Sequence, residues 1–206
     1  AIIAIPVAAL MFRLRGAYFA IGTWVVAEVF RLLASQISVL GGGSGISLPA
    51  SAVIAMAPSR TAREFETYWL ALAITVVVLA TIVALLRSRH GLALTAIRDN
   101  EAAAQSTGID VTRIKFAVYV LTGFGTAMVG ALIFLMKLRI SPDTAFSVND
   151  WTAFVIFITV IGGIGRIEGP IIGTVIFFAL RQTLSDLGSL YLLMMGAVAI
   201  IVMLWA

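Results

Sequence analysis

The chain has 206 residues, of which 61% are hydrophobic, 12% are charged and none is cysteine. Its mean hydropathy is +1.09. Soluble domains contain about 45–50% apolar and about 25% charged residues, so this composition excludes an ordinary soluble enzyme, a disordered regulator and a disulfide-stapled secreted domain. We therefore expect a polytopic membrane protein with room for about six or seven spanning helices of ~20 residues each.

The formal net charge of +4 does not indicate a nucleic-acid partner. The basic residues stand singly or in pairs between apolar stretches, which is typical of charges that set membrane topology and not of a nucleic-acid footprint. Lack of cysteine excludes thiol chemistry, and a single histidine without nearby carboxylates does not make a metal site. We expect no cofactor, no metal and no nucleic acid.

In chain order, the apolar stretches predict an all-α bundle that forms a single membrane domain over residues 1–206, truncated at both ends. The expected spans are residues 1–12, 17–40, 69–86, 116–136, 151–165, 171–184 and 190–206. A signal peptide is a weaker alternative for the first stretch, because Pro6 lies in its middle and no positive charge precedes it.

The orientation follows from the basic residues of the hydrophilic loop 87–115, which the positive-inside rule places in the cytoplasm. These residues are Arg87, Arg89, Arg98, Arg113 and Lys115. Alternation then puts Arg13, Arg15 and Arg166 inside, and the loops 41–67, 137–150 and 185–189 outside. Four cations fall outside against the rule, namely Arg60, Arg63, Lys137 and Arg139.

The most informative segment is residues 90–116, which read HGLALTAIRDNEAAAQSTGIDVTRIKF. Asn100 or Asp99 is a suitable N-cap for a short helix over 101–107, and Gly108 is a suitable C-terminal stop. The alanines at 102–104 leave a low surface on which a soluble partner can dock. A solvated loop helix without a partner is the alternative interpretation.

This segment resembles the cytoplasmic coupling loop, or EAA loop, of ABC-importer permeases. The whole chain resembles the permease subunit of high-affinity branched-chain amino-acid importers. The other supporting stretches are RLRGAYFAIGTWVVAEVFRLL at 13–33, GGGSGISLP at 41–49, ISPDTAFSVNDW at 140–151 and VIGGIGRIEGPIIGT at 160–174. The general importer pattern is matched imperfectly, because four residues rather than three separate Ala103 from Gly108 and the Ile-x-Leu-Pro tail is absent.

The resemblance implies a multi-pass permease of the bacterial cell inner membrane that imports branched-chain or other hydrophobic amino acids. It implies a second related permease subunit, cytoplasmic ATP-binding subunits and an external substrate-binding protein. The chain has no Gly-x4-Gly-Lys-Ser/Thr loop, so we expect ATP hydrolysis in a separate subunit and no enzymatic activity here. The residues assigned to coupling are Arg98, Asp99, Asn100, Glu101, Ala102, Ala103, Ala104 and Gly108.

Two other functions stay open. A permease for urea, amides or simple sugars would use the same machinery. An ion-driven secondary transporter would need buried carboxylates in mid-membrane, for which Glu28 is the candidate.

Glu28 and Arg31 lie three residues apart in the predicted span 17–40 and therefore share a helix face. A charged residue at the centre of a spanning helix costs about 2.5–3.5 kcal/mol, and a partner reduces that cost. The pair predicts either a polar lining or gate of the pathway, or a structural pair near the outer interface.

Small residues recur in two other places. Gly123, Ala127 and Ala131 predict close helix packing. Gly165, Gly169 and Gly173 are interrupted by Pro170, so for them we expect a tight cytoplasmic re-entry in which Arg166 and Glu168 meet a soluble partner.

Overall fold

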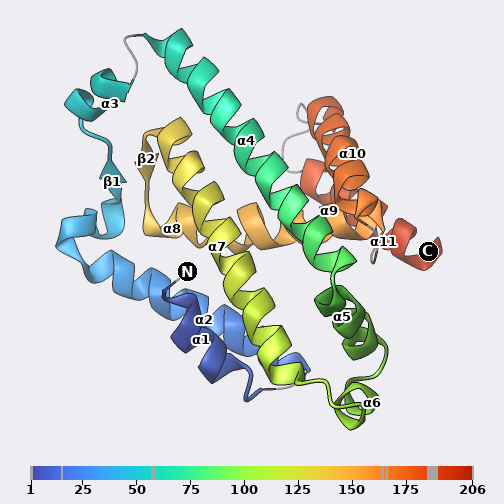
Figure 1. Cartoon of the computed structure of the whole chain (residues 1–206). Helices are drawn as coiled ribbons and strands as arrows, with labels where there is room; N and C mark the ends of the chain where they lie inside the picture. The colour runs from blue at the N-terminus through green and yellow to red at the C-terminus, as the bar shows by residue number, and fades with distance from the viewer. Residues whose placement is uncertain are drawn as a thin grey trace. The chain divides into compact units, whose positions relative to one another are not determined.

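The computed structural model describes residues 2–14, 16–56, 59–163, 165, 167–184 and 190–205. These residues are largely helical, with two short strands, which confirms the predicted all-α class (Figure 1). The chain divides into two compact units, Ala1–Ala145 and Phe146–Ala206, which are described separately below.

Four helical segments of the described residues are long and apolar enough to cross a membrane, by length and composition. They are Ala17–Gln36, Arg60–Arg87, Val111–Lys137 and Pro142–Gly162. The remaining predicted spans form shorter helices: α1 (Ala4–Met11), α10 (Glu168–Leu184) and α11 (Leu190–Trp205). The predicted turn 185–189, Arg15 and Arg166 lie outside the described residues.

In the first unit, the longest helices are α4 (Arg60–Arg87) and α7 (Val111–Lys137), which pack against each other. Both begin before the apolar stretch that predicted them. Ser59 caps α4 by accepting a hydrogen bond from the Ala62 amide, and Asp110 caps α7 through the Arg113 amide. Apolarity marks the part of a helix that lies in lipid, whereas caps mark where the helix starts. At 28 residues, α4 is about 42 Å long and extends beyond a ~30 Å hydrocarbon core.

Helices α2 (Ala17–Gln36), α3 (Ala50–Met56) and the short α8 (Pro142–Ala145) also belong to this unit. Helix α1 packs against α2 and α7. A β-carbon on Gly123 would lie 3.1 Å from the Ala4 side chain, so Gly123 serves the close packing that the small-residue pattern predicted. Ala127 and Ala131 are exposed in this chain.

Two loops that were expected on the same side of the membrane meet at one end of the first unit. Strand β1 (Ile46–Ser47) pairs in antiparallel fashion with β2 (Arg139–Ile140). Two of the four cations that oppose the positive-inside rule have polar partners at this end. The Arg139 guanidinium donates to the Ser44 carbonyl at 3.0 Å, and Arg60 pairs with Glu64 at 2.8 Å. The two loops lie at the same end of the unit, which agrees with the predicted topology. That this end faces the outside of the cell stays a prediction.

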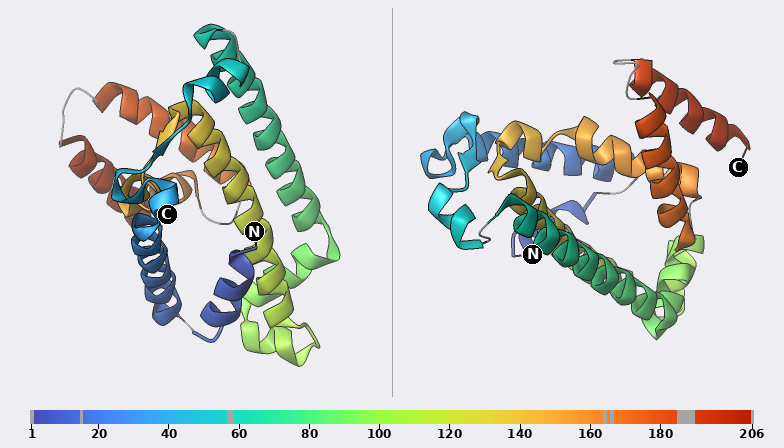
Figure 2. Two further views of the ribbon diagram at one scale, coloured as in Figure 1. Left: turned by 90° about the vertical axis from the view of Figure 1, so that its left-hand side faces the viewer. Right: turned by 90° about the horizontal axis from the view of Figure 1, so that it is seen from above.

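At the opposite end, α4 is followed by α5 (Arg89–Asp99) and α6 (Glu101–Ser106), after which α7 begins (Figures 1 and 2). The predicted cytoplasmic loop 87–115 is thus mostly helical. Its two short helices connect the ends of the two longest helices of the unit.

The second unit consists of a π-helical turn, Val148–Ala153, followed by α9 (Phe154–Gly162), α10 and α11. Helices α9 and α10 approach closely at glycines: a β-carbon on Gly162 would lie 1.8 Å from the Gly169 carbonyl oxygen. Phe157 and Phe177 are buried between the two helices, with ring centroids 5.8 Å apart.

The expectation for the second glycine series needs correction. Pro170 does not interrupt α10, because it lies in the first turn, where its missing amide hydrogen has no intrahelical acceptor. Gly169 and Gly173 therefore share one face of a continuous helix and pack against α9. Gly165 lies outside the helix with a φ of +97°.

Replacement of Gly173 by alanine tests this packing. The added β-carbon would lie 2.0 Å from the Ile158 carbonyl oxygen, so α9 and α10 would have to separate. We expect Gly173→Ala to destabilise the protein by ~1–3 kcal/mol, the usual cost of overpacking. Thermal unfolding of the purified full-length protein in detergent measures the effect. Gly130→Ala is the control, because its β-carbon meets nothing within 4 Å; equal melting temperatures would contradict the packing.

Candidate functional site at the α5–α6–α7 corner

The turn from α4 into α5 is tight and locally determined. Ser88 caps α5, its Oγ accepting a hydrogen bond from the His90 amide at 3.2 Å. Gly91 is buried, and a β-carbon there would lie 2.0 Å from the Leu86 carbonyl oxygen. Only glycine fits this corner without a shift of backbone, so α5 turns directly from the end of the long α4.

Helix α6 begins at Glu101 as predicted and ends at Ser106, one residue before the predicted end. The Asn100 side-chain oxygen accepts a hydrogen bond from the Ala103 amide at 3.0 Å, so Asn100 is the N-cap. Asp99, the alternative cap, instead pairs with Arg98 at 3.0 Å. Gly108 has a φ of +86°, a left-handed conformation that ends helices and that glycine adopts without strain. The predicted short capped helix is therefore present.

Apolar contacts hold α6 against its neighbours. Ile97 of α5, Ala104 of α6 and Val111 of α7 form a buried cluster, in which Ala104 is 3% exposed. Ile109 and Ile114 pack around this cluster. Ala104 was predicted to contribute to a docking surface, but in this structure it faces the cluster.

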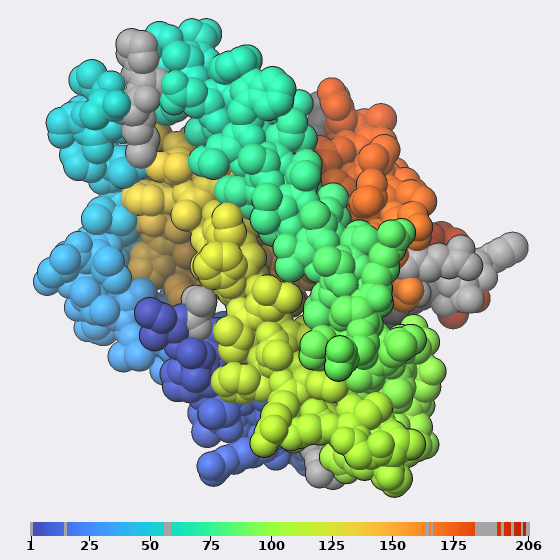
Figure 3. All heavy atoms as spheres, viewed as in Figure 1, coloured from blue at the N-terminus to red at the C-terminus, as the bar shows by residue number. Residues whose placement is uncertain are grey.

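The remaining residues of the predicted set lie on the surface. They are Arg98, Asp99, Asn100, Glu101, Ala102, Ala103 and Gly108, all exposed. In the space-filling view they belong to the yellow-green end of the first unit (Figure 3). The corner thus presents an exposed face of small and polar residues on a helix whose buried side is fixed.

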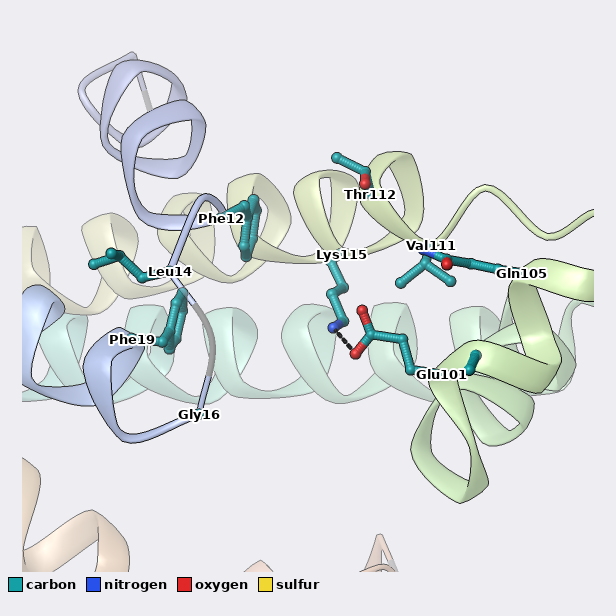
Figure 4. Close-up of a pocket in the computed structure, with 10 residues that line it drawn as sticks. Phe12, Leu14, Gly16, Phe19, Glu101, Gln105, Val111, Thr112 and Lys115 are labelled. Atoms are coloured by element: carbon teal, nitrogen blue, oxygen red, sulfur yellow. Dashed lines mark hydrogen bonds and ion pairs between the residues drawn. The ribbon is translucent and has the colours of Figure 1, made fainter.

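An ion pair that the sequence analysis did not identify joins α6 to α7. The Lys115 Nζ lies 2.7 Å from Glu101 Oε2, and the two side chains are 38% and 51% exposed (Figure 4). The two residues are 14 positions apart with a turn between them, and no helical spacing relates them. The opposite charges of Glu101 and Lys115 were visible in the sequence, but their proximity was not.

A hollow of about 510 Å³ lies beside this ion pair. It is lined by residues of the α1–α2 turn, of α6 and of the first turns of α7, namely Phe12, Leu14, Gly16, Phe19, Glu101, Ala102, Gln105, Val111, Thr112 and Lys115. Phe12 and Phe19 stack with ring centroids 5.9 Å apart on one side of it. The hollow separates the α1–α2 turn from α6 (Figure 4).

The second predicted pair, Glu28 and Arg31, is formed within α2, with Arg31 Nη2 2.6 Å from Glu28 Oε1. Arg31 also reaches Asp143 of α8, at 2.5 Å between Nη1 and Oδ1. Asp143 lies in the predicted loop 137–150, and no spacing in the sequence connects it with Arg31. The network therefore links α2 to α8 near the β1–β2 end, whereas a role in the pathway or in gating stays a prediction.

Within the part of the chain that the structure describes, no three His, Cys, Asp or Glu side chains gather into a candidate metal site.

Comparison with known families decides the identity of the chain. The model of the family "Branched-chain amino acid transport system / permease component" matches residues 1–203. The chain belongs to this permease family. Family membership and the long apolar helices make it a multi-pass protein of the inner membrane.

Individual relatives agree with this family. The high-affinity branched-chain amino acid transport system permease protein LivM of Escherichia coli K12 is 31% identical over 94% of this chain and 50% of its own length, and that of Salmonella typhimurium gives the same values. The ribose import permease protein RbsC of Haemophilus influenzae is 35% identical over 52% of this chain and 35% of its own length. The chain spans about half the length of its LivM relatives. No solved structure matches it significantly.

Substitution of Ala104 tests the inward packing of α6. We expect Ala104→Leu to destabilise the permease by ~1–3 kcal/mol, because the larger side chain overpacks the cluster with Ile97 and Val111. Ala103→Leu is the matched control on the exposed side of the same helix. Thermal unfolding of both full-length variants in detergent measures the difference, and an unchanged melting temperature for Ala104→Leu would contradict the packing.

Proposed function

We propose that this permease forms part of an ATP-driven importer that translocates branched-chain or other hydrophobic amino acids across the inner membrane. ATP is hydrolysed by a separate cytoplasmic subunit, since this chain has no Gly-x4-Gly-Lys-Ser/Thr loop. The observation that carries the proposal is the α5–α6–α7 corner. There, two short helices connect the ends of two long apolar helices, and the second of them, α6, has an exposed face.

In this proposal the exposed face of α6 receives the ATP-binding subunit. Ala102 and Ala103 offer a low surface, and Arg98, Asp99 and Glu101 surround it with charge. Asn100 and Gly108 fix the two ends of the helix. Displacement of α6 by the partner shifts the ends of α4 and α7, and different affinities of the partner for two shapes of the permease bias the transport cycle.

The surfaces of the helices support the proposal of further partners. Many large apolar side chains of α2 and α4 are exposed in this chain, for example Trp24 at 61% and Val76 at 57%. Such faces require lipid or protein, and we propose the bilayer and a second related permease subunit as their cover. An external substrate-binding protein would meet the β1–β2 end of the first unit.

A sugar permease is the second candidate, because the RbsC of H. influenzae is also similar to this chain. The similarity to LivM extends over 94% of the chain and that to RbsC over 52%, which favours amino acids. Uptake by the complete importer, reconstituted with its binding protein, should be measured for leucine, isoleucine, valine, urea and ribose. Transport of ribose or urea without transport of the amino acids would overturn the proposed substrate.

Docking on α6 is tested by one enlarged side chain. We expect Ala103→Tyr to obstruct the ATP-binding subunit at a cost of ~1–3 kcal/mol, or an affinity about 5- to 150-fold weaker, with a matching loss of ATP-dependent uptake. Pull-down and vesicle uptake measure the two effects. Ala50→Tyr, at an exposed position at the start of α3, is the control. Normal assembly and uptake in Ala103→Tyr would exclude α6 as the docking element.

The proposed gating role of Glu28 and Arg31 is tested through their third partner. Asp143→Asn weakens the link between α2 and α8 and keeps the pair within α2. We expect a slower ATP-dependent uptake and little change in melting temperature. The control is Glu64→Gln, which removes an exposed ion pair within α4. A lower melting temperature with normal uptake would make the link structural only.

A further inference from the structure

We propose that Lys115 is a positioning residue for coupling: its ion pair with Glu101 fixes α6 to α7, so that a displacement of α6 passes into α7. This inference rests on the proposed function and adds a residue outside the predicted coupling set.

The ion pair differs from its neighbours in what it connects. Arg98 pairs with the adjacent Asp99, and Arg113 pairs with Asp110 at the start of its own helix. Of the ion pairs between residues 88–137, all of which the structure describes, the pair of Lys115 with Glu101 joins two helices. The pair of Lys115 with Glu101 therefore restrains the position of α6 relative to α7, whereas the other two ion pairs join residues that are neighbours along the chain.

Helix α6 is attached to α7 at two points. Glu101 is the first residue of α6 and meets Lys115, while Ala104 lies three positions later and packs against Val111. Val111 and Lys115 are four residues apart and so lie on the same face of α7. Two contacts along one face resist rotation of α6 about either contact alone, so the two helices move together.

Packing joins α6 to α5 and to α7. A displacement of α6 therefore acts on α7 directly. Helix α7 is continuous over 27 residues, about 40 Å, and ends beside β2. The displacement of α6 is therefore carried from the coupling corner to the β1–β2 end.

The test uses the complete importer in liposomes with its ATP-binding subunit. Lys115→Met removes the charge and keeps a long apolar side chain. We expect the variant to assemble and hydrolyse ATP, but to import about two- to fivefold less substrate per ATP hydrolysed, as suits a partly exposed ion pair. Lys115→Arg keeps the positive charge and should retain the ratio. Arg113→Met is the matched control, because Arg113 is 88% exposed and pairs within α7.

An unchanged ratio in Lys115→Met, or a lowered ratio in Lys115→Arg, would overturn the inference. If Lys115→Met does not assemble, Lys115→Arg decides: normal assembly with a normal ratio supports the role of the positive charge, and failure of either overturns it. Failure of the proposed function would be recognised separately from failure of this inference, because the unaltered protein would then show no ATP-dependent uptake at all.

Discussion

The attachment of α6 to α7 is the interaction on which a coupling role depends. A short helix in a loop transmits force only if its buried side is fixed, and here the fixing comes from the cluster of Ile97, Ala104 and Val111 together with the ion pair of Glu101 and Lys115. Local capping by Asn100 forms the helix. The contacts with Val111 and Lys115 hold this helix against the first turns of the spanning helix α7.

The two ends of the first unit have different kinds of connection. At the corner, α6 packs against α5 and α7, and a hollow lies beside its ion pair with Lys115. At the opposite end, the strand pair β1–β2 and the link from Arg31 to Asp143 join elements that are distant in sequence. In the proposed function, the first end receives the ATP-binding subunit and the second end faces the external binding protein, with α7 reaching from one to the other.

The exposed apolar faces have a simple physical origin. In water they would be destabilising, but lipid or the apolar face of another spanning helix is a suitable environment for them. Helices in a bilayer satisfy their own backbone hydrogen bonds, so they require few contacts within one chain. This explains why a chain that is so apolar has a small buried core, and why additional chains are expected around it.

The sequence by itself determined the features that depend on composition and local spacing. Apolar stretches predicted the helices and the membrane class, and Asn100 and Gly108 predicted the boundaries of α6, because caps act on amides a few residues away. The EAA-like segment indicated the permease family that the comparisons then established. The true starts of α4 and α7 were missed because their first turns are polar, although Ser59 and Asp110 were available as caps.

Only the tertiary structure decided which distant residues meet. Arg31 and Asp143 are 112 positions apart, and Glu101 and Lys115 are separated by a turn, so no helical period connects either pair. The inward direction of Ala104 likewise depends on how α6 is rotated against α5 and α7. A local pattern specifies the conformation of a segment, whereas the contact between two segments depends on the path of the whole chain between them.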